Sequence, residues 1–423
     1  MSEGDLKNFL GPELFFFISC QKQMLVGFLS AFLVSFVIDF QTPNRMAYQI
    51  PLSFPVFEGN ESLYVQEAMN SGHLATNGVF INKFETKLGR KIKTHQVVAL
   101  NSGTSALHLA LVLLGIGPGD EVICQSFTFC ASANPIVYLG ATPIFVDSEK
   151  ETWNISPEIL EDAILSRISL GRKPKAIVVV HLFGMPAKMK EIMAISKKYN
   201  IPILEDAAEA VGSKIDGKFC GTFGKLGVFS FNGNKIITSG GGGALISDDA
   251  GLIERSRYLA SQAREDLPYY QHLEIGFNYR MTNISAAVGV AQLEQLDQMV
   301  AKRRKVNQRY KELMKSFPGI SFQEDQENSE SNFWLTTILL NEQETGISND
   351  RLRVILFKNG IETRFLWKPL HLQPIYRKTP YYGGNVSEKL FDQGLCLPSS
   401  SNLTLDQQEY ILDLIEKEFR KVI

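Results

Sequence analysis

Lys235 is the residue of this sequence with the clearest potential for covalent chemistry. It lies in a turn between two short apolar runs of β type, at residues 228–231 and 244–246, and a run of glycines at 240–243 follows it. Burial between strands disfavours the charged form of a lysine, and a neutral amine can attack an aldehyde to form a Schiff base. The segment also fits a surface lysine in a glycine-rich hairpin, so other residues must decide.

Hydroxyl groups stand where a predicted strand turns into a helix. Thr104 and Ser105 follow Gly103 at the start of that helix, and Ser230 precedes Lys235 by five residues. Helix N-termini bind anions through their backbone N–H groups, so these residues predict a phosphate site without a lysine of its own. Serine and threonine are also favoured as ordinary helix caps, which is the simpler interpretation of the same pattern.

Two acids, Glu205 and Asp206, follow a predicted strand at residues 201–204. Acids beside a buried strand are costly unless each has a partner. Asp206 can hold a proton on a ring nitrogen, which turns the ring into an electron sink, or it can cap the following turn. Phe129 lies just beyond a strand at 121–125 and can cover a flat cofactor, although phenylalanines more often belong to the core.

An amide and a guanidinium, Asn278 and Arg280, stand just before a long predicted helix. An arginine in such a position is usually solvated or ion-paired, and its planar fork also suits a diphosphate. The five cysteines and six histidines are scattered without the spacing of metal ligands. We therefore expect no metal site and no disulfides, and a reducing compartment, the cytoplasm.

The segments around these residues predict the scaffold. From residue 50 onward, short apolar strands alternate with amphipathic helices, one of them at 128–138, which favours a mostly parallel sheet with helices on both faces. Ligands bind beyond the carboxyl ends of such strands. One long helical run at 281–314 leads into a smaller α+β region. We expect a large cofactor-binding domain at 46–290, and a linking helix with a small C-terminal domain at 291–423.

Residues 1–45 do not share this alternation. Their apolar stretch at 24–38 is shorter than the roughly 20 residues of a membrane span, and no basic segment of a signal peptide precedes it. A membrane anchor at 14–40, an accessory helix and an extension upstream of a working start at Met46 are the alternatives, and we expect the extension. The net charge of −2 without a long basic block gives no reason to expect nucleic acid as a partner.

Four motifs occur in one order along the chain: Gly103-Thr-Ser-Ala-Leu107, Glu205-Asp-Ala-Ala-Glu209, Ser230-Phe-Asn-Gly-Asn-Lys-Ile-Ile237 and Gly276-Phe-Asn-Tyr-Arg-Met-Thr-Asn283. From about residue 50 to its end, the chain resembles the DegT/DnrJ/EryC1/StrS family of sugar aminotransferases. The resemblance implies the fold type I of aspartate aminotransferase and the cofactor pyridoxal 5'-phosphate. Two further segments resemble the branch that makes 4-amino sugars, which includes the bacillosamine-type enzymes: Trp367-Lys-Pro-Leu-His371 and Cys396-Leu-Pro-Ser-Ser-Ser-Asn402.

The resemblance also implies roles for the cofactor-binding residues. Lys235 would form the Schiff base and move protons, Asp206 would pair with the pyridine nitrogen, and Phe129 would stack on the ring. Glu209 would lie near the phenolic oxygen, where relatives often carry glutamine or histidine. The residues that would surround the phosphate are Gly103, Thr104, Ser105 and Ser230.

Two residues would serve beyond this pocket. Asn278 matches a residue that the family sends across a dimer interface to the partner subunit's cofactor, which implies a homodimer with shared active sites. Arg280 would lie near the phosphates of a nucleotide-sugar substrate. The sequence departs from the family at Ser239-Gly-Gly-Gly242, where many members carry an acid, and we expect this to change loop flexibility rather than chemistry.

The implied reaction transfers an amino group from glutamate to a nucleotide-linked 4-keto-6-deoxy sugar, for surface glycan or polysaccharide biosynthesis. We expect UDP-2-acetamido-2,6-dideoxy-hex-4-ulose as the substrate. A 3-aminotransferase and a binding protein that keeps the fold without turnover are the alternatives, and intact Lys235 and Asp206 argue against the latter. Lys235 also argues against the 3-dehydratases of the family, which carry a histidine there. A dinucleotide-binding oxidoreductase is set aside, because the glycines at 240–243 lack the G-x-G-x-x-G spacing.

Overall fold

The computed structural model describes residues 49–94 and 96–419. The prediction for residues 1–45 lies outside this part of the chain. None of the helices in the described part is long and apolar enough to cross a membrane.

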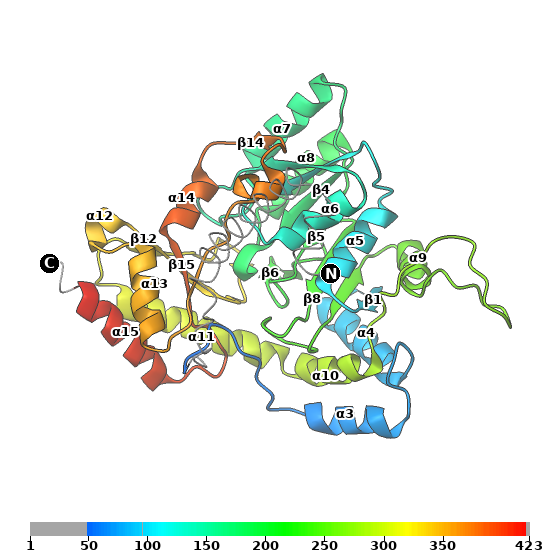
Figure 1. The fold of residues 1–423 in the computed structure, drawn as a ribbon, viewed down its shortest axis with the longest axis horizontal. Coiled ribbons are helices and arrows are strands. Elements are labelled where there is room, and N and C mark those ends of the chain that lie inside the picture. The colour runs from blue at the N-terminus through cyan, green and yellow to red at the C-terminus, as the bar shows by residue number, and fades with distance from the viewer. Residues whose placement is uncertain (1–48, 95, 420–423) are drawn as a thin grey trace, which may run out of the picture. The chain divides into compact units, whose positions relative to one another are not determined.

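An eight-stranded sheet forms the centre of the fold (Figure 1), in the order β1-β9-β8-β5-β4-β2-β3-β14. All neighbours from β8 to β14 run parallel, whereas β9 is antiparallel to both β1 and β8. The mostly parallel sheet predicted from the sequence is therefore confirmed. Its strands are β1 (Val97–Leu100), β2 (Glu121–Gln125), β3 (Thr142–Val146), β4 (Ala176–Val180), β5 (Ile203–Asp206), β8 (Leu226–Ser230), β9 (Gly243–Ile246) and β14 (Tyr381–Tyr382).

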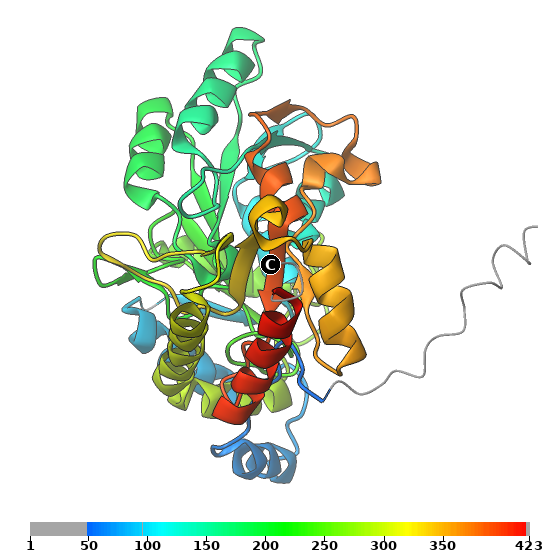
Figure 2. The same cartoon turned by 90° about the vertical axis from the view of Figure 1, so that its left-hand side faces the viewer.

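Both faces of this sheet are buried. Successive side chains of each strand point to opposite faces, so neighbouring residues belong to different cores. Val122 and Val178 belong to a core shared with α5 (Gly103–Leu113), α6 (Asn134–Tyr138) and α9 (Ala250–Ala260). Their neighbours Ile123 and Ile177 belong to a second core shared with α7 (Pro157–Ser169) and α8 (Met189–Tyr199). Figure 2 shows these last two helices, in green, on one side of the sheet. The continuous apolar strands of the sequence thus reflect a sheet covered on both faces.

A third core includes β1 and packs three helices against the large sheet. It joins α4 (Val79–Ile92) and α10 (Asn283–Glu294), with α3 (Glu61–Asn70) packed on the same side. A separate helix, α11 (Leu296–Met314), follows after Gln295. The single helical run predicted at 281–314 is therefore two helices.

A second, four-stranded sheet follows α11 and is antiparallel throughout, in the order β10-β12-β15-β13. Its core joins strand residues such as Ile338 to Tyr310 of α11 and Ile411 of the last helix. Near it in the chain, β14 returns to pair with β3 of the large sheet. The elements of this region are β10 (Ile320–Phe322), β12 (Thr336–Leu340), α12 (Glu342–Thr345), α13 (Asn349–Lys358), β13 (Arg364–Phe365), α14 (Val386–Gln393), β15 (Gly394–Leu397) and α15 (Leu405–Phe419).

The helix predicted at 128–138 is broken. A 3-10 turn at Cys130–Ser132 precedes α6, which begins at Asn134. Pro135 stands at the start of α6, and a proline lacks the N–H that a helix interior needs, so it fits only in a first turn. Smaller elements complete the structure: a three-stranded sheet of β6 (Lys214–Ile215), β7 (Lys218–Phe219) and β11 (Ser329–Glu330), and 3-10 turns at Leu182–Gly184, Leu370–Leu372 and Pro374–Tyr376.

Candidate active site

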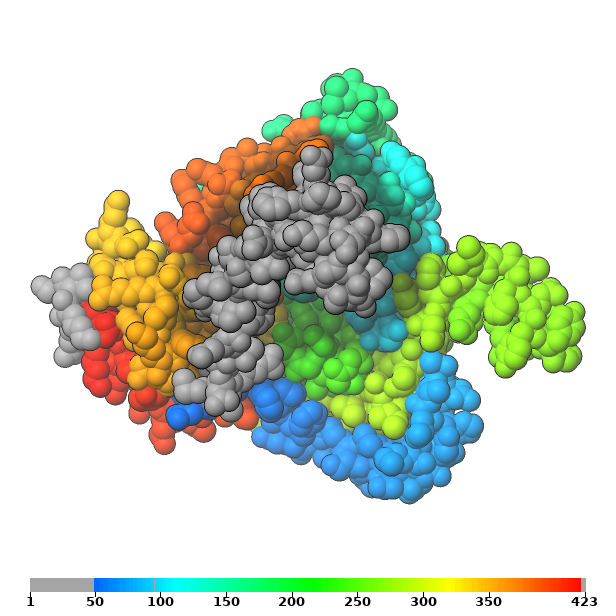
Figure 3. Space-filling model, in the orientation of Figure 1, coloured from blue at the N-terminus to red at the C-terminus, as the bar shows by residue number. Residues whose placement is uncertain are grey.

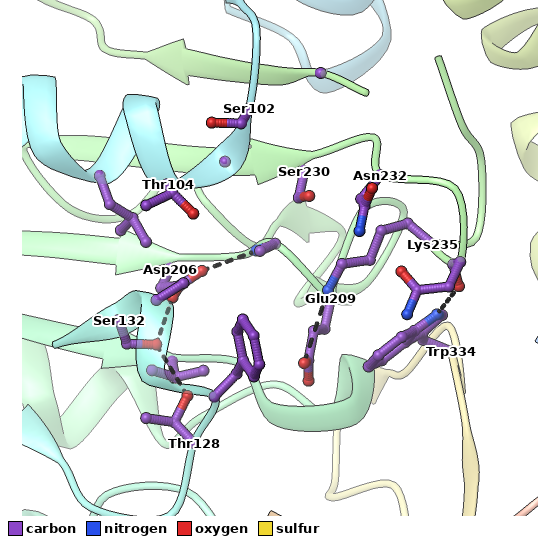
Figure 4. Close-up of a pocket in the computed structure, with 18 of the residues that line it drawn as sticks. Ser102, Thr104, Thr128, Ser132, Asp206, Glu209, Ser230, Asn232, Lys235 and Trp334 are labelled. Carbon is purple, nitrogen blue, oxygen red and sulfur yellow. Dashed lines mark hydrogen bonds and ion pairs between the residues drawn. The ribbon is translucent and has the colours of Figure 1, made fainter. Parts of the chain in front are cut away.

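A cavity of about 390 Å³ lies at the carboxyl ends of the parallel strands (Figure 4). This is the position where open α/β sheets bind ligands. It brings together residues from three of the four motifs that occur in order along the chain, all but the one at 276–283. The predicted site residues that line it are Gly103, Thr104, Phe129, Asp206, Glu209, Ser230 and Lys235.

Lys235 is held inside this cavity. It lies in the turn after β8, where its backbone N–H donates to the carbonyl of Asn232 at 3.0 Å. Its side chain is only 13% exposed, so a surface lysine in a hairpin does not describe it. Its Nζ lies 3.8 Å from Oε1 of Glu209 and 4.2 Å from the centre of the Trp334 ring. The amine therefore faces both an acid and an aromatic ring.

Asp206 ends β5 and is buried between parallel strands. Ser132 donates a hydrogen bond of 2.7 Å to its Oδ2, and the N–H of Ala208 donates to Oδ1 at 3.2 Å. Burial raises the pKa of Asp206, and the hydrogen bond from Ser132 opposes that rise. The carboxyl group is thus held in a fixed orientation at the cavity wall, where a cationic partner would stabilise its charge.

Glu205 does not share this cavity, because adjacent residues of a strand point to opposite faces. Its carboxylate accepts backbone N–H groups of the segment at 221–224, including Gly221 at 2.8 Å. It also lies 2.9 Å from Nε2 of His181. Both acids therefore have the partners that their burial requires, and only Asp206 is available for cofactor chemistry.

Glu209 is the second acid of the cavity. The backbone N–H of Phe183 donates to its Oε2 at 2.6 Å, while Oε1 faces Lys235. Burial raises the pKa of Glu209, and the nearby Lys235 opposes this effect. The positive charge of Lys235 thus opposes the rise in pKa of both buried acids, Asp206 and Glu209. A second positive charge next to Asp206 would stabilise its carboxylate further.

The start of α5 forms an anion site on the same cavity. Ser102 caps the helix by accepting the N–H of Ser105 at 3.0 Å. The hydroxyls of Thr104 and Ser230 line the cavity, and neither has a hydrogen-bond partner within the described part of the chain. A Cβ on Gly103 would lie 3.0 Å from Cβ of Ser230, so this close approach of helix and strand favours glycine. These groups suit a phosphate at a helix N-terminus.

Ser105 does not line the cavity with the other predicted phosphate residues. Its hydroxyl donates to Oδ1 of Asn101 at 2.6 Å and lies 2.8 Å from Oγ of Ser102. Ser105 thus belongs to the cap of α5, and its contact with a phosphate stays a prediction.

Phe129 lies at the edge of the cavity with 48% of its surface exposed, whereas Phe127 is fully buried. Its ring packs against Trp367 with 5.1 Å between the centroids. Phe127 is therefore the core phenylalanine of this segment, and Phe129 offers an aromatic face to a ligand.

Asn278 and Arg280 lie outside the Lys235 cavity of their own chain. They line a separate depression of about 310 Å³ next to the segment that follows α9. Arg280 is ion-paired, with its Nη1 3.0 Å from Oε1 of Glu85, which also pairs with Arg257. The roles of Asn278 toward a partner subunit and of Arg280 toward substrate phosphates stay predictions.

Several lining residues were not foreseen from the sequence, among them Ser132, Trp334 and Trp367 as parts of the Lys235 cavity. Ser132 lies in the 3-10 turn that replaced a predicted helix. Trp334 precedes β12, about one hundred residues after Lys235, and no local pattern links the two. The sequence marks Trp367 only as part of a family motif.

Comparison with known proteins decides the family. The model of the DegT/DnrJ/EryC1/StrS aminotransferase family matches residues 56–416. The chain belongs to this family. It is 47% identical to the EpsN protein of Bacillus subtilis (strain 168), which is named as a pyridoxal phosphate-dependent aminotransferase. The 381 matched residues cover 89% of this chain and 97% of that protein.

Two further comparisons agree. The GDP-perosamine synthase of Escherichia coli O157:H7 is 39% identical over 368 residues, which cover 87% of this chain and 98% of that protein. The crystal structure of a DegT DnrJ EryC1 StrS aminotransferase from Brucella abortus superimposes with a TM-score of 0.79 at 33% identity, covering 85% of this chain and 95% of that one. The chain is a sugar aminotransferase that depends on pyridoxal phosphate.

The cavity of this DegT/DnrJ/EryC1/StrS aminotransferase fits that cofactor. Free hydroxyls and a helix N-terminus suit its phosphate, and the Asp206 carboxylate suits a protonated ring nitrogen. The amine of Lys235 suits its aldehyde, and Phe129 provides an aromatic face. The role of each residue toward the cofactor stays a prediction, which the chemistry of the lining groups supports.

Proposed function

We propose that this aminotransferase transfers the amino group of glutamate to C4 of a nucleotide-linked 4-keto-6-deoxy sugar, with UDP-2-acetamido-2,6-dideoxy-hex-4-ulose as the expected substrate. The product would be an amino sugar for surface glycan or polysaccharide assembly. The name of the Escherichia coli relative, GDP-perosamine synthase, supports a nucleotide-linked sugar.

The observation that carries the proposal is a second cavity of about 610 Å³ that borders the Lys235 cavity. The two share Phe129, Trp334 and Trp367 among their lining residues. A cavity of about 390 Å³ suits a cofactor and a reacting sugar ring, whereas a nucleotide needs further space. The second cavity supplies that space directly beside the Lys235 cavity.

The lining of the second cavity suits a sugar linked to a diphosphate. Trp367 and Phe365 offer aromatic faces, and Arg364 and Lys368 supply positive charge. Arg364 is paired with Glu362 at 2.8 Å, while Lys368 has no ion-pair partner among the residues that the structure describes. Arginine and lysine are the side chains that bind phosphates, and aromatic rings pack on sugars and bases.

Within the Lys235 cavity, each residue would have a separate task. Pyridoxal phosphate supplies, when bound, an aldehyde that accepts the amino group and a protonated ring that takes up electrons. Asp206 would hold the proton on the ring nitrogen, and Lys235 would accept and return the proton that moves between substrate carbon and cofactor. Glu209 would keep the region of the phenolic oxygen protonated, since a buried negative charge favours a nearby proton.

A homodimer with shared active sites is part of the proposal. Asn278 would contact the cofactor phosphate of the partner subunit, which agrees with its place outside its own cavity. The segment between α9 and α10 stands out from the molecule in Figure 3. Four of its apolar side chains are strongly exposed, which favours burial against a second copy: Tyr269, Tyr270, Leu273 and Ile275.

A panel of keto sugars tests the proposal. Holoenzyme is incubated with glutamate and with UDP-linked, GDP-linked and dTDP-linked 4-keto-6-deoxy sugars, and with 3-keto sugars of the same nucleotides. We expect amination of a UDP-linked 4-keto sugar, with the new C–N bond placed at C4 by NMR. Amination at C3, or of none of the 4-keto sugars, would overturn the proposal.

A further inference from the structure

We propose that the indole of Trp334 is the resting place of the free Lys235 amine, so that Trp334 acts as a positioning residue for the capture and release of the cofactor. The inference rests on the proposed role of Lys235. It starts from the short distance of 4.2 Å between Nζ of Lys235 and the centre of a tryptophan ring that is only 2% exposed.

An aromatic face holds an ammonium group by attraction to the electrons of the ring, and tryptophan does so most strongly among the side chains. The nearest acid is farther away than a hydrogen bond allows, because Oε1 of Glu209 lies 3.8 Å from Nζ of Lys235. The ring therefore keeps the amine in place without a hydrogen bond that must break before the amine can react. Figure 4 shows the three side chains together in the cavity.

The ring itself is tied to the backbone beside Lys235. Nε1 of Trp334 donates to the carbonyl of Asn234, the residue before Lys235, at 2.7 Å. The same carbonyl accepts the hydroxyl of Ser53 at 2.8 Å. The hydrogen bond from Nε1 thus ties the indole to the turn that carries Lys235, so that the ring face is held next to the amine.

A buried arginine anchors this unit from α11. Nη1 of Arg303 donates to the carbonyl of Trp334, and Nη2 donates to the hydroxyl of Ser53 at 3.1 Å. Within the described chain no carboxylate pairs with Arg303, although the residue is 1% exposed. A buried charge without an ionic partner is costly. The hydrogen bonds of Arg303 to Trp334 and Ser53 offset part of that cost, and they connect both residues to the turn that carries Lys235.

The neighbouring Asn332 connects Trp334 to the second group that faces the amine. Its Oδ1 accepts the N–H of Trp334 at 2.8 Å, and its Nδ2 donates to the carbonyl of Glu209 at 3.0 Å. One short segment before β12 therefore sets both the ring and the acid next to Lys235. Because the ring and the acid are both held in place, the amine of Lys235 can return to the same position after each reaction cycle.

The test measures how fast apoenzyme captures pyridoxal phosphate, followed by stopped-flow absorbance at pH 8. The variants are Trp334→Phe, which keeps a ring but loses the N–H, and Trp334→Leu, which loses the aromatic face. Trp153→Phe is the matched control, since Trp153 is 3% exposed in the same core and does not line the cavity. Lys235→Ala gives the background without the amine.

Loss of the ring face leaves the amine without the surface that holds it in place. Capture of the cofactor by Trp334→Leu should therefore be about 10- to 100-fold slower than by wild type. Trp334→Phe keeps an aromatic ring, so its capture rate should fall between the two. The control should match wild type.

An unchanged capture rate in Trp334→Leu would overturn the inference, even if affinity for the cofactor fell. If that variant does not fold, Trp334→Phe decides alone, and an unchanged capture rate again overturns the inference. Cofactor capture needs neither glutamate nor a sugar. Failure of every keto sugar to react would therefore count against the proposed function and leave this result standing.

Discussion

Ser132 donates a hydrogen bond of 2.7 Å to Oδ2 of Asp206, and the hydroxyl of Thr128 lies 2.9 Å from that of Ser132. All three residues line the Lys235 cavity. The bond fixes the carboxylate and opposes the rise in the pKa of Asp206 that burial causes, which favours the charged form that a cationic ring nitrogen needs. Ser132, in a 3-10 turn, thus affects both the orientation and the pKa of Asp206 at the end of β5.

Replacement of Ser132 tests this relationship. Ser132→Ala should weaken pyridoxal phosphate binding by about 1.5–3 kcal/mol, the usual range for a hydrogen bond to a charged group. Equilibrium dialysis of apoenzyme against the cofactor measures the loss. Ser132→Thr keeps the hydroxyl and should restore most of the affinity. Equal affinities in wild type and Ser132→Ala would show that the bond has no such role.

Asp206 should lower the stability of the apoprotein, although it would stabilise the bound cofactor. Burial raises its pKa, so its ionisation in the folded state costs free energy at neutral pH. Asp206→Asn should therefore increase the free energy of unfolding of apoprotein at pH 8 by about 0.5–2 kcal/mol. Below the unfolded-state pKa of about 3.9 the acid is neutral in both states, and the gain should vanish.

Thermal melts of both apoproteins between pH 3.5 and 8 measure this effect. The same variant should hold the cofactor more weakly than wild type, so the gain in stability comes with a loss of function. An Asp206→Asn apoprotein that melts below wild type at pH 8 would contradict the account of the buried charge.

Shared active sites predict an unusual result for mixed dimers. Asn278→Ala should reduce cofactor retention, and Lys235→Ala should abolish turnover. A hybrid of one Asn278→Ala subunit and one Lys235→Ala subunit would carry both defects in one site and none in the other. Such hybrids should regain about half of the wild-type activity.

Differently tagged subunits, mixed and purified as hybrids, allow that measurement. If each subunit used only its own Asn278, one site would lack the lysine and the other would keep the asparagine defect. Activity no higher than that of Asn278→Ala dimers would therefore exclude sharing.

Much of the fold could be predicted because each strand is marked by the apolar residues of its own short segment. The strand predicted at 121–125 matches β2, whose three central residues are apolar, as a parallel sheet buried on both faces requires. Lys235, Asp206 and Thr104 could be singled out because each stands just after a strand or at a helix start, where side chains meet at one edge of the sheet.

The remaining features depend on contacts between distant parts of the chain. Trp334 reaches Lys235 only through the packing of the segment before β12 against the lysine turn. Ser132 faces Asp206 because Pro135 prevents one continuous helix through this segment. Arg280 is drawn to Glu85 of α4, a partner almost two hundred residues away. No local pattern reports any of these pairs.

The covalent site of the cofactor tests the central claim most directly. Holoenzyme is reduced with borohydride, digested with a protease and analysed by peptide mass spectrometry. We predict one adduct with the mass of a reduced phosphopyridoxyl group, located on Lys235, and none in Lys235→Ala, which should also fail to aminate any keto sugar. An adduct on another lysine, or undiminished amination by Lys235→Ala, would contradict the account.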